Sequence, residues 1–115
     1  MSSNCQHTIT TSLEILVGKW KPIILFHLAV NKTLRFSELH RLIPDITKKM
    51  LTTQLRELEF HKIVHREVYA QVPPKVEYSI TEYGKTLEPI LVEMNKWGEK
   101  HLEMMKNETI EKNSI

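Results

Sequence analysis

The sequence predicts a mainly α-helical domain that carries one small β-hairpin, and two neighbouring segments indicate this. Residues 47–61 carry apolar side chains at helical spacing, and the opposite side of the helix that this spacing predicts is basic. Residues 63–69 and 76–80 indicate two strands around the turn Pro73-Pro74. A basic helix directly followed by a β-hairpin is the layout of a winged helix-turn-helix, whose second helix fits the major groove of DNA. We therefore expect a DNA-binding fold.

The composition limits the class of protein. The chain has 115 residues, enough for one domain with a modest core, and its 41% hydrophobic and 26% charged residues exclude intrinsic disorder. No apolar run approaches the ~20 residues of a membrane-spanning helix, and Met1 to Cys5 lack the basic and apolar regions of a signal peptide. A single cysteine excludes an internal disulfide, and together these features indicate a cytoplasmic protein.

Positive charge is concentrated before the C-terminal third of the chain, although the net charge is only +2. Residues 35–81 hold eight Lys and Arg against six Asp and Glu, whereas residues 82–115 hold five Lys against seven Glu. The basic part is the one expected to meet a phosphate backbone, and the acidic C-terminal part is expected to face away from it.

The first two helices are expected over residues 8–18 and from Pro22 onward. Thr11 and Ser12 could cap a shorter version of the first helix and Gly18 would end it, while Pro22 suits a first turn because its missing N–H costs nothing there. The first helix carries the apolar stripe Ile9, Leu13, Leu16 and Val17. The second is apolar nearly all round, which predicts the buried centre of the domain: Ile23, Ile24, Leu25, Phe26, Leu28 and Ala29.

The third and fourth helices are expected over residues 36–43 and 47–61. Ser37 and Glu38 lie near the start of the third helix, where a hydroxyl or carboxylate meets exposed N–H groups, and Thr47 is a good N-cap for the fourth. The side chains predicted to face inward are Phe36, Leu39, Leu42 and Ile43 in the third helix, and Met50, Leu51, Leu55 and Leu58 in the fourth.

A long C-terminal helix is expected after the hairpin, capped by Thr81, and Pro89 should kink it or mark the start of a second segment. Its apolar stripe of helical period consists of Leu87, Ile90, Leu91, Met94, Trp97, His101 and Met105. From about Lys106 the chain becomes polar. We expect a winged-helix domain over residues 1–106, with N- and C-terminal dimerisation helices, and a fraying polar tail over residues 107–115.

The basic face of the fourth helix is the main candidate site. Such a face is often only a solvated surface, but here Glu57 and Glu59 occur only toward the C-terminal end, and hydroxyl and amide groups suited to base edges lie between the cations. In the hairpin, Lys75 could reach a phosphate or the minor groove, although Pro73-Pro74 would fit any rigid turn. The candidate DNA-binding residues are Lys48, Lys49, Thr52, Thr53, Arg56 and Lys75.

Neither a metal site nor an enzymatic site is predicted. Cys5 and His7 are two residues apart and His61 and His65 four apart, but the second pair straddles the expected helix end, and no second cysteine or acidic partner stands at ligand spacing. Nucleophile–base constellations and glycine-rich phosphate loops are also missing. We therefore expect no cofactor, no metal and no catalytic residue.

Six motifs follow one another over about residues 5–101, in order and without insertions: Gly18-Lys19-Trp20, Arg35 to Leu39, Ile43 to Thr47, Leu51 to Leu58, Pro73 to Gly84 and Trp97-Gly98. Each motif is weak alone, and together they are highly specific. On these motifs the chain resembles the HxlR-type transcriptional regulators, a branch of winged-helix proteins related to the MarR group.

This resemblance implies a homodimer that binds DNA through a winged helix, often with a thiol or small-molecule input. Two positions depart from the pattern of the family. Lys62 stands where members commonly have glycine before the first wing strand, and a left-handed Lys62 would cost about 1 kcal/mol. Members with a sensing cysteine often have Cys-Pro near the N-terminus, where this chain has Cys5-Gln6.

The predicted function is that of a sequence-specific DNA-binding regulator of transcription, acting as a homodimer on a palindromic operator in double-stranded DNA. The alternative is a winged-helix module for protein or RNA contact without sequence-specific DNA binding. The helix-turn-helix core cannot cover the apolar sides of both terminal helices, so these sides are the expected dimer contacts: Ile9, Leu13, Leu16, Leu87, Ile90, Leu91, Met94 and Trp97.

Cys5, the only cysteine, is the candidate redox-sensing residue, and the alternative is an inert thiol in a frayed N-terminus. Near the start of the helix over residues 8–18 the helix dipole would favour the thiolate form of Cys5, and Lys19 or Lys21 could add positive charge. The resemblance implies a small-molecule oxidant or electrophile as its partner, because related regulators use a cysteine just before the first helix as a sensor.

Overall fold

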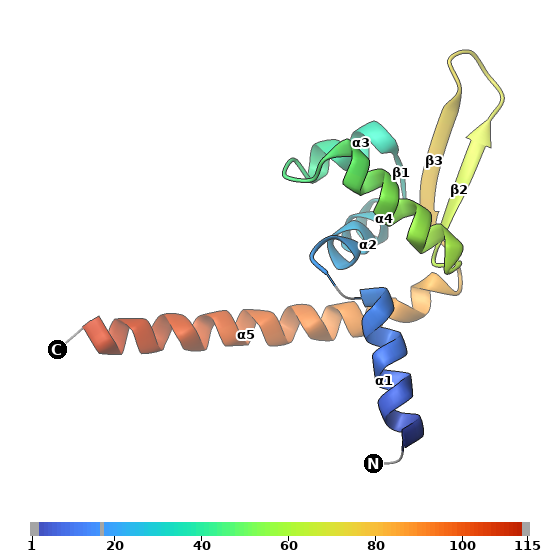
Figure 1. Cartoon of the computed structure of the whole chain (residues 1–115). Helices are drawn as coiled ribbons and strands as arrows, with labels where there is room; N and C mark the ends of the chain where they lie inside the picture. The colour runs from blue at the N-terminus through green and yellow to red at the C-terminus, as the bar shows by residue number, and fades with distance from the viewer. Residues whose placement is uncertain (1–2, 17, 114–115) are drawn as a thin grey trace. The chain divides into compact units, whose positions relative to one another are not determined.

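The computed structural model describes residues 3–16 and 18–113, which are mainly helical and include one small sheet (Figure 1). The chain forms two compact units, Met1–Lys85 and Thr86–Ile115. The predicted fold class, mainly α with a β-hairpin, is confirmed. In chain order the elements are α1 (Ser3–Leu16), α2 (Trp20–Asn31), β1 (Thr33–Arg35), α3 (Phe36–Leu42), α4 (Lys48–Phe60), β2 (Val64–Tyr69), β3 (Lys75–Ile80), the short 3-10 helix η1 (Gly84–Leu87) and α5 (Glu88–Asn113).

Helix α1 begins at Ser3, five residues earlier than expected. Thr11 and Ser12 do not cap it, because their hydroxyls donate to the carbonyl oxygens four residues earlier, at 3.0 and 3.2 Å, as hydroxyls inside a helix do. Gly18 follows the helix with a φ of +94°, a left-handed conformation that favours glycine, so its predicted role at the helix end is confirmed. Val17 lies outside the described residues.

Helix α2 lies at the centre of the core of the first unit, but only one side of the helix is buried. Phe26 and Val30 of α2 are 58% and 65% exposed. The expectation that α2 is buried nearly all round is wrong for this outer face, because a helix in a small domain turns only one side to the core. The buried apolar side chains are Ile24, Leu25, Leu28, Leu34, Leu39, Ile43, Ile46, Leu51, Leu55, Leu58, Ile63 and Val64.

The turn between α3 and α4 is fixed at both ends. Ile43 and Ile46 are buried, and the Nε2 atom of His40 lies 2.9 Å from the carbonyl oxygen of Ile46, to which it donates. Thr47 then caps α4 as predicted, since its Oγ1 accepts a hydrogen bond from the backbone N–H of Met50 at 3.0 Å. The direction in which α4 leaves the turn is set by these contacts.

Two of the four side chains predicted to face inward from α3 do so. Leu39 and Ile43 are buried, whereas Phe36 is half-buried and Leu42 is exposed, because a helix of seven residues presents only a narrow stripe to the core. In α4, Met50 is 40% exposed, contrary to expectation, since it lies about 100° around the helix from the first buried leucine. The buried side chains of α4 are Leu51, Leu55 and Leu58.

The sheet has three antiparallel strands in the order β1-β3-β2. Strand β3 pairs with β2 from Val64↔Ile80 to Tyr69↔Lys75, which is the predicted hairpin. It also pairs with β1 through Leu34↔Tyr78. Sequence reasoning missed β1, because a strand of three residues with one buried side chain leaves too short a pattern to recognise.

The turn from α4 to β2 requires a left-handed residue, and Lys62 takes that conformation with a φ of +63°. The backbone N–H of Lys62 donates to the carbonyl oxygen of Glu59 at 2.9 Å, and that of Ile63 to the carbonyl oxygen of Leu58 at 3.0 Å. A left-handed lysine costs about 1 kcal/mol, which these helix-closing hydrogen bonds and the burial of Ile63 offset.

Thr81 caps the turn after β3 and not the long C-terminal helix, which corrects the prediction. Its hydroxyl donates to the carbonyl oxygen of Lys62 at 2.6 Å and accepts from the backbone N–H of Gly84 at 2.8 Å. The base of the hairpin is thereby tied to the end of α4.

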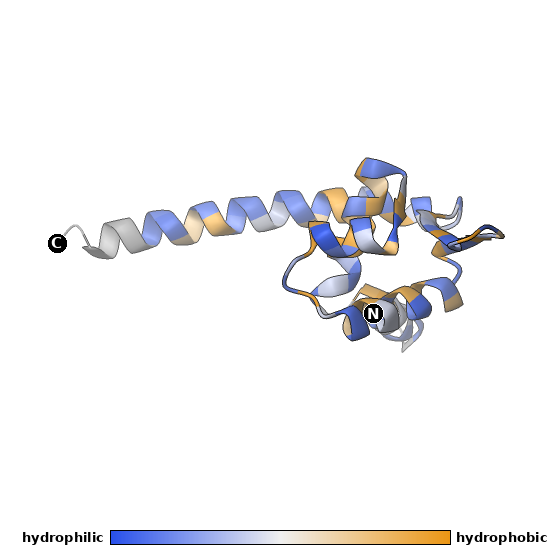
Figure 2. Cartoon of the chain, turned by 90° about the horizontal axis from the view of Figure 1, so that it is seen from above, coloured by the Kyte–Doolittle hydropathy of each residue, from blue (hydrophilic) through white to orange (hydrophobic). Residues whose placement is uncertain are grey.

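Helix α5 begins at Glu88, with Pro89 as its second residue, so the proline marks the start of a separate segment, as one of the two predicted outcomes. The helix continues to Asn113, beyond the polar transition near Lys106 where the chain was expected to fray. Figure 2 shows apolar and hydrophilic residues interspersed along α5. In the described residues no helix combines the length and the apolar character needed to cross a membrane.

Candidate nucleic-acid interface

The outer face of α4 is basic and polar. Lys49, Thr53 and Arg56 follow one another at spacings of four and three residues, which places them on one side of the helix, opposite the three buried leucines. All three side chains are exposed. The first turn of α4 contains no acidic residue. We name the side chains of Lys49, Thr53 and Arg56 the outer stripe.

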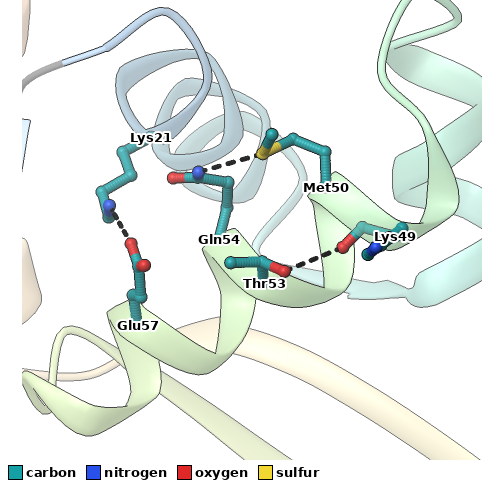
Figure 3. A network of polar contacts seen from close by, with 6 residues as sticks. All are labelled: Lys21, Lys49, Met50, Thr53, Gln54 and Glu57. Atoms are coloured by element: carbon teal, nitrogen blue, oxygen red, sulfur yellow. Dashed lines mark hydrogen bonds and ion pairs between the residues drawn. The ribbon is translucent and has the colours of Figure 1, made fainter.

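Lys48 and Thr52 lie on the flank of α4 and not on the outer stripe. Thr52 is half-buried, and its hydroxyl donates to the carbonyl oxygen of Lys48 at 2.8 Å. The hydroxyl of Thr53 donates likewise to the carbonyl oxygen of Lys49, at 3.0 Å (Figure 3). Both hydroxyl protons are therefore used inside the helix, so each threonine offers an outside partner its oxygen lone pairs and its methyl group.

The N-terminal end of α4 is an electropositive surface. Thr47 satisfies the N–H of Met50, and the other N–H groups of the first turn remain directed out of the helix. Lys48 and Lys49 add two full charges in the same turn, and neither is in an ion pair with another described residue. Such an end is suited to a phosphate.

An ion pair between α2 and α4 holds Glu57, which lies one helical turn from Thr53 of the outer stripe. The Lys21 ammonium contacts the Glu57 carboxylate, and Lys21 is only 7% exposed (Figure 3). On the same flank, the side-chain amide of Gln54 donates to the sulfur atom of Met50 at 3.3 Å. Sequence reasoning missed this role of Lys21, because a lysine is normally assigned to the surface.

The two lysines considered as neighbours of Cys5 both have contacts of their own. The ammonium of Lys21 is paired with Glu57. The ammonium of Lys19 lies over the ring of Trp20, 4.7 Å from its centre. Cys5 itself is exposed and lies inside the first turn of α1, not before the first helix as expected.

The charges of the hairpin are mostly compensated within it. The Lys75 ammonium is 2.7 Å from a carboxylate oxygen of Glu77 and 5.0 Å from the ring centre of Tyr69. His65 lies 2.6 Å from a carboxylate oxygen of Glu67. Lys75 is therefore a weaker phosphate ligand than its sequence position indicates, because a phosphate would have to compete with Glu77.

Arg66 is a candidate that sequence reasoning missed. It is exposed on β2, pairs across the hairpin with Tyr78, and is in no ion pair with another described residue. The signal was present in the alternation of the strand, since Arg66 falls between His65 and Glu67 and so points to the other side of the hairpin.

The predicted dimerisation residues leave apolar surface exposed in each unit considered by itself. In the first unit Ile9 and Leu13 are exposed and Leu16 is half-buried. In the second unit Leu87 and Leu91 are half-buried, Trp97 is 68% exposed and its ring stacks on His101 at a centroid distance of 5.0 Å. Ile90 and Met94 are exposed as well.

The residues that the structure describes include no group of three or more His, Cys, Asp or Glu able to hold a metal ion. The two histidine and cysteine pairs noted in the sequence are therefore not brought together into a site within these residues. The conspicuous chemistry of the described chain is the basic face of α4.

The chain matches the profile of the HxlR-like helix-turn-helix family over residues 15–106. It is 58% identical over 93 residues to the uncharacterised HTH-type transcriptional regulator YdeP of Bacillus subtilis, a match that covers 81% of this chain and 72% of YdeP.

Solved structures of regulators are similar to it as well, among them those of HypR and YodB. The redox regulator HypR in its reduced form has 51% sequence identity and a TM-score of 0.81, with 87% of this chain and 98% of that chain covered. The reduced form of the transcriptional regulator YodB from B. subtilis has 34% identity and a TM-score of 0.72, with 81% and 90% covered. The helix-turn-helix of α3 and α4 is followed by the β2–β3 hairpin, whose sheet β1 completes, and this arrangement confirms the predicted winged helix-turn-helix.

Proposed function

We propose that this chain, which belongs to the HxlR-like helix-turn-helix family, binds a palindromic operator as a homodimer and places α4 in the major groove of each half-site. Its family and its relatives are transcriptional regulators with a DNA-binding fold, so the chain is a regulator of transcription and not an enzyme.

The observation that carries the proposal is the outer stripe of α4. Cations and hydroxyl groups alternate along it, and Glu57, one helical turn from Thr53, is paired with Lys21. A face of this kind can contact both phosphates and bases. A module that contacts protein or RNA through general electrostatics needs no such alternation of cations and hydroxyl groups.

The outer stripe divides into a phosphate contact and a base contact. Replacing Lys49 with alanine should weaken binding to all DNA sequences alike and lower the salt dependence by about one unit, since one phosphate contact is lost. Replacing Arg56 with alanine should change the sequence preference, at about 1–3 kcal/mol for a lost contact to guanine. Both effects are measured by titrating each variant with duplexes selected for binding from random DNA, and with random duplexes, at several salt concentrations.

Lys100→Ala, which removes an exposed cation from the acidic C-terminal part, is the charge-matched control and should leave binding unchanged. If the wild-type protein bound selected and random duplexes equally, the proposal of operator binding would be wrong. The alternative function, a module for protein or RNA contact, would then hold. If Lys49→Ala and Arg56→Ala weakened every sequence equally, Arg56 would not contact bases.

The terminal helices are proposed to pack across a two-fold axis. The predicted dimerisation residues represent on the order of 10 kcal/mol of burial free energy, at ~1.5–3 kcal/mol for each large side chain. A second copy offers the same surfaces in return, and a two-fold axis would set the two α4 helices about one DNA turn, ~34 Å, apart.

Trp97→Ala should weaken this dimer by about 2 kcal/mol or more, roughly 30-fold in Kd, because a large exposed aromatic side chain is the kind of residue that dominates an interface. Sedimentation over a range of micromolar concentrations measures the change. Lys96→Ala, at the neighbouring position, removes only a surface ion pair with Glu93 and should have little effect. A wild-type monomer at these concentrations would contradict the dimer.

Cys5 is proposed as the input of the regulator, a role supported by the similarity to HypR, which is a redox regulator. Diamide oxidises two thiols to one disulfide and takes up their two electrons and two protons. With one cysteine in each chain, the disulfide joins two Cys5 residues or joins Cys5 to a small thiol. Either product would change how the α1 helices pack in the dimer.

Diamide or a quinone should therefore change operator affinity for the wild type and leave Cys5→Ser unaffected. Fluorescence anisotropy with a labelled operator, before and after treatment, measures this. An exposed thiol permits the reaction, and a serine of nearly the same size keeps the first turn of α1 intact. An equal response of both proteins, or of neither, would remove Cys5 from the mechanism.

A further inference from the structure

Met50 lies on the flank of α4 that also carries Gln54 and Glu57, beside the outer stripe (Figure 3). Spacings of four and three residues place these three side chains in one row along the helix. Met50 is 40% exposed, although a methionine is ordinarily a core residue because its side chain is apolar. Only part of its side chain therefore contributes to the core, and its sulfur atom is within reach of small solutes.

The sulfur atom of Met50 is held by a polar neighbour. The side-chain amide of Gln54 donates to Sδ at 3.3 Å, and Gln54 itself is half-buried. A thioether sulfur is a weak acceptor, and this hydrogen bond leaves a lone pair of the sulfur free. Gln54 thus directs the thioether while the free lone pair stays open to reagents from solvent.

A thioether in this position can accept an oxygen atom from a peroxide. The free lone pair of Sδ attacks one oxygen of hydrogen peroxide, so that an S–O bond forms, the O–O bond breaks and the sulfur gives up two electrons. The departing hydroxide takes the proton of the transferred oxygen, which leaves water and methionine sulfoxide. The sulfoxide oxygen carries partial negative charge and is a stronger acceptor than the thioether sulfur, so the amide N–H of Gln54 stabilises the product more than the starting state.

We propose that Met50 is an oxidation site on α4, converted by peroxides to methionine sulfoxide with the help of Gln54, and that it is an input separate from Cys5. Diamide takes electrons from thiols and transfers no oxygen, so it acts on Cys5 and leaves the thioether unchanged. Methionine sulfoxide reductases return the thioether, which makes the modification reversible.

The oxidation itself needs no DNA, and only its effect on binding rests on the proposed function. A sulfoxide oxygen accepts hydrogen bonds but donates none, as do the oxygens of a phosphate backbone. Lys49 precedes Met50 in the same turn of α4, and the partial negative charge of the sulfoxide would weaken the attraction of that turn for phosphate. Oxidation of Met50 should therefore lower the affinity for DNA.

The first measurement follows the oxidation alone. The full-length Cys5→Ser protein is treated with hydrogen peroxide, digested and analysed by mass spectrometry, with and without the further change Gln54→Leu. Met104 of α5, which is 50% exposed, records the dose of oxidant in each sample. Relative to Met104, Met50 should be oxidised about fivefold more slowly in the Gln54→Leu protein, the effect expected for the loss of one hydrogen bond.

The second measurement is fluorescence anisotropy with an operator selected from random DNA. Peroxide should lower the affinity of the Cys5→Ser protein about three- to fivefold, since one weak acceptor becomes a strong one beside a cation. Treatment with methionine sulfoxide reductases should restore it. The further change Met50→Leu, which keeps size and apolar character, should abolish the response, whereas Met104→Leu is the matched control and should retain it.

The proposal is overturned if Gln54→Leu leaves the relative rate of oxidation unchanged, or if the Met50→Leu protein loses as much affinity in peroxide as its parent. Failure of the DNA-binding proposal gives a different result. Met50 would then still be oxidised faster with Gln54 than without it, but selected duplexes would bind no better than random ones before and after treatment.

Discussion

Replacing Gly84 with alanine is expected to destabilise the fold by about 3 kcal/mol or more. A Cβ atom at this position would lie well inside van der Waals contact of the carbonyl oxygen of Ile63, and 2.8 Å from Cγ2 of Ile80. The first obstacle is backbone and cannot rotate away. It belongs to the start of the wing, so relief of the clash would displace the hairpin from the end of α4.

Gly98→Ala is the matched control, since apart from its chain neighbours and the backbone of its own helix the added Cβ in α5 meets no described atom within 4 Å. There alanine should stabilise the helix by about 0.5–1 kcal/mol, because glycine is the poorer helix former. Urea unfolding at one fixed protein concentration measures both variants. Equal unfolding midpoints for Gly84→Ala and the wild type would mean that the turn can shift without cost and does not fix the wing.

Most of the helix-turn-helix could be predicted because its signals are local. Thr47 caps α4 where a hydroxyl precedes an apolar stripe, and Pro22 and Pro89 fall in first turns. The hairpin followed from its two strands around Pro73-Pro74. Each of these features depends on residues a few positions apart.

The features that sequence reasoning missed depend on distant partners. Strand β1 exists because Leu34 lies opposite Tyr78, far along the chain. Thr81 caps a turn rather than α5 because the carbonyl oxygen of Lys62 lies within reach of its hydroxyl. Met50 shows a related limit: its apolar character predicts burial, but only the direction of the core relative to α4 decides it.

The sequence assigns the same role to all the candidate residues of α4, whereas the structure places them on two different sides of the helix. The basic run predicted Lys48, Lys49, Thr52, Thr53 and Arg56 as one set. The geometry of α4 separates Lys49, Thr53 and Arg56 on the outer stripe from the two on its flank. To separate the two groups one must know which side of α4 is buried, and the sequence indicates that side only approximately.

Removing the carboxylate of Glu57 is expected to cost more stability than removing its partner Lys21. Lys21 is 7% exposed, so in Glu57→Ala its ammonium stays in a nearly dry site without a counter-ion. Breaking a fully buried pair costs about 3–5 kcal/mol, and since half of the Glu57 side chain is exposed we expect about 2–3 kcal/mol here. Lys21→Met keeps an apolar stem in the same space and leaves Glu57 hydrated, which should cost less than about 1 kcal/mol.

Urea unfolding of the two single variants and the double variant measures this asymmetry. The double variant should resemble Lys21→Met, because it no longer contains an unpaired buried charge. Equal losses in the two single variants would indicate that Lys21 reaches water whenever Glu57 is absent.

DNA binding should show the opposite order of effects. Lys21→Met leaves the Glu57 carboxylate uncompensated one helical turn from Thr53 on the outer stripe, where it would repel a phosphate. Affinity should therefore fall several-fold in this variant at low salt, with little loss of stability. The double variant, which lacks that carboxylate, should recover most of the affinity. A Lys21→Met protein that bound DNA like the wild type would show that Glu57 lies too far from the backbone to matter, and that the ion pair serves only the packing of α2 against α4.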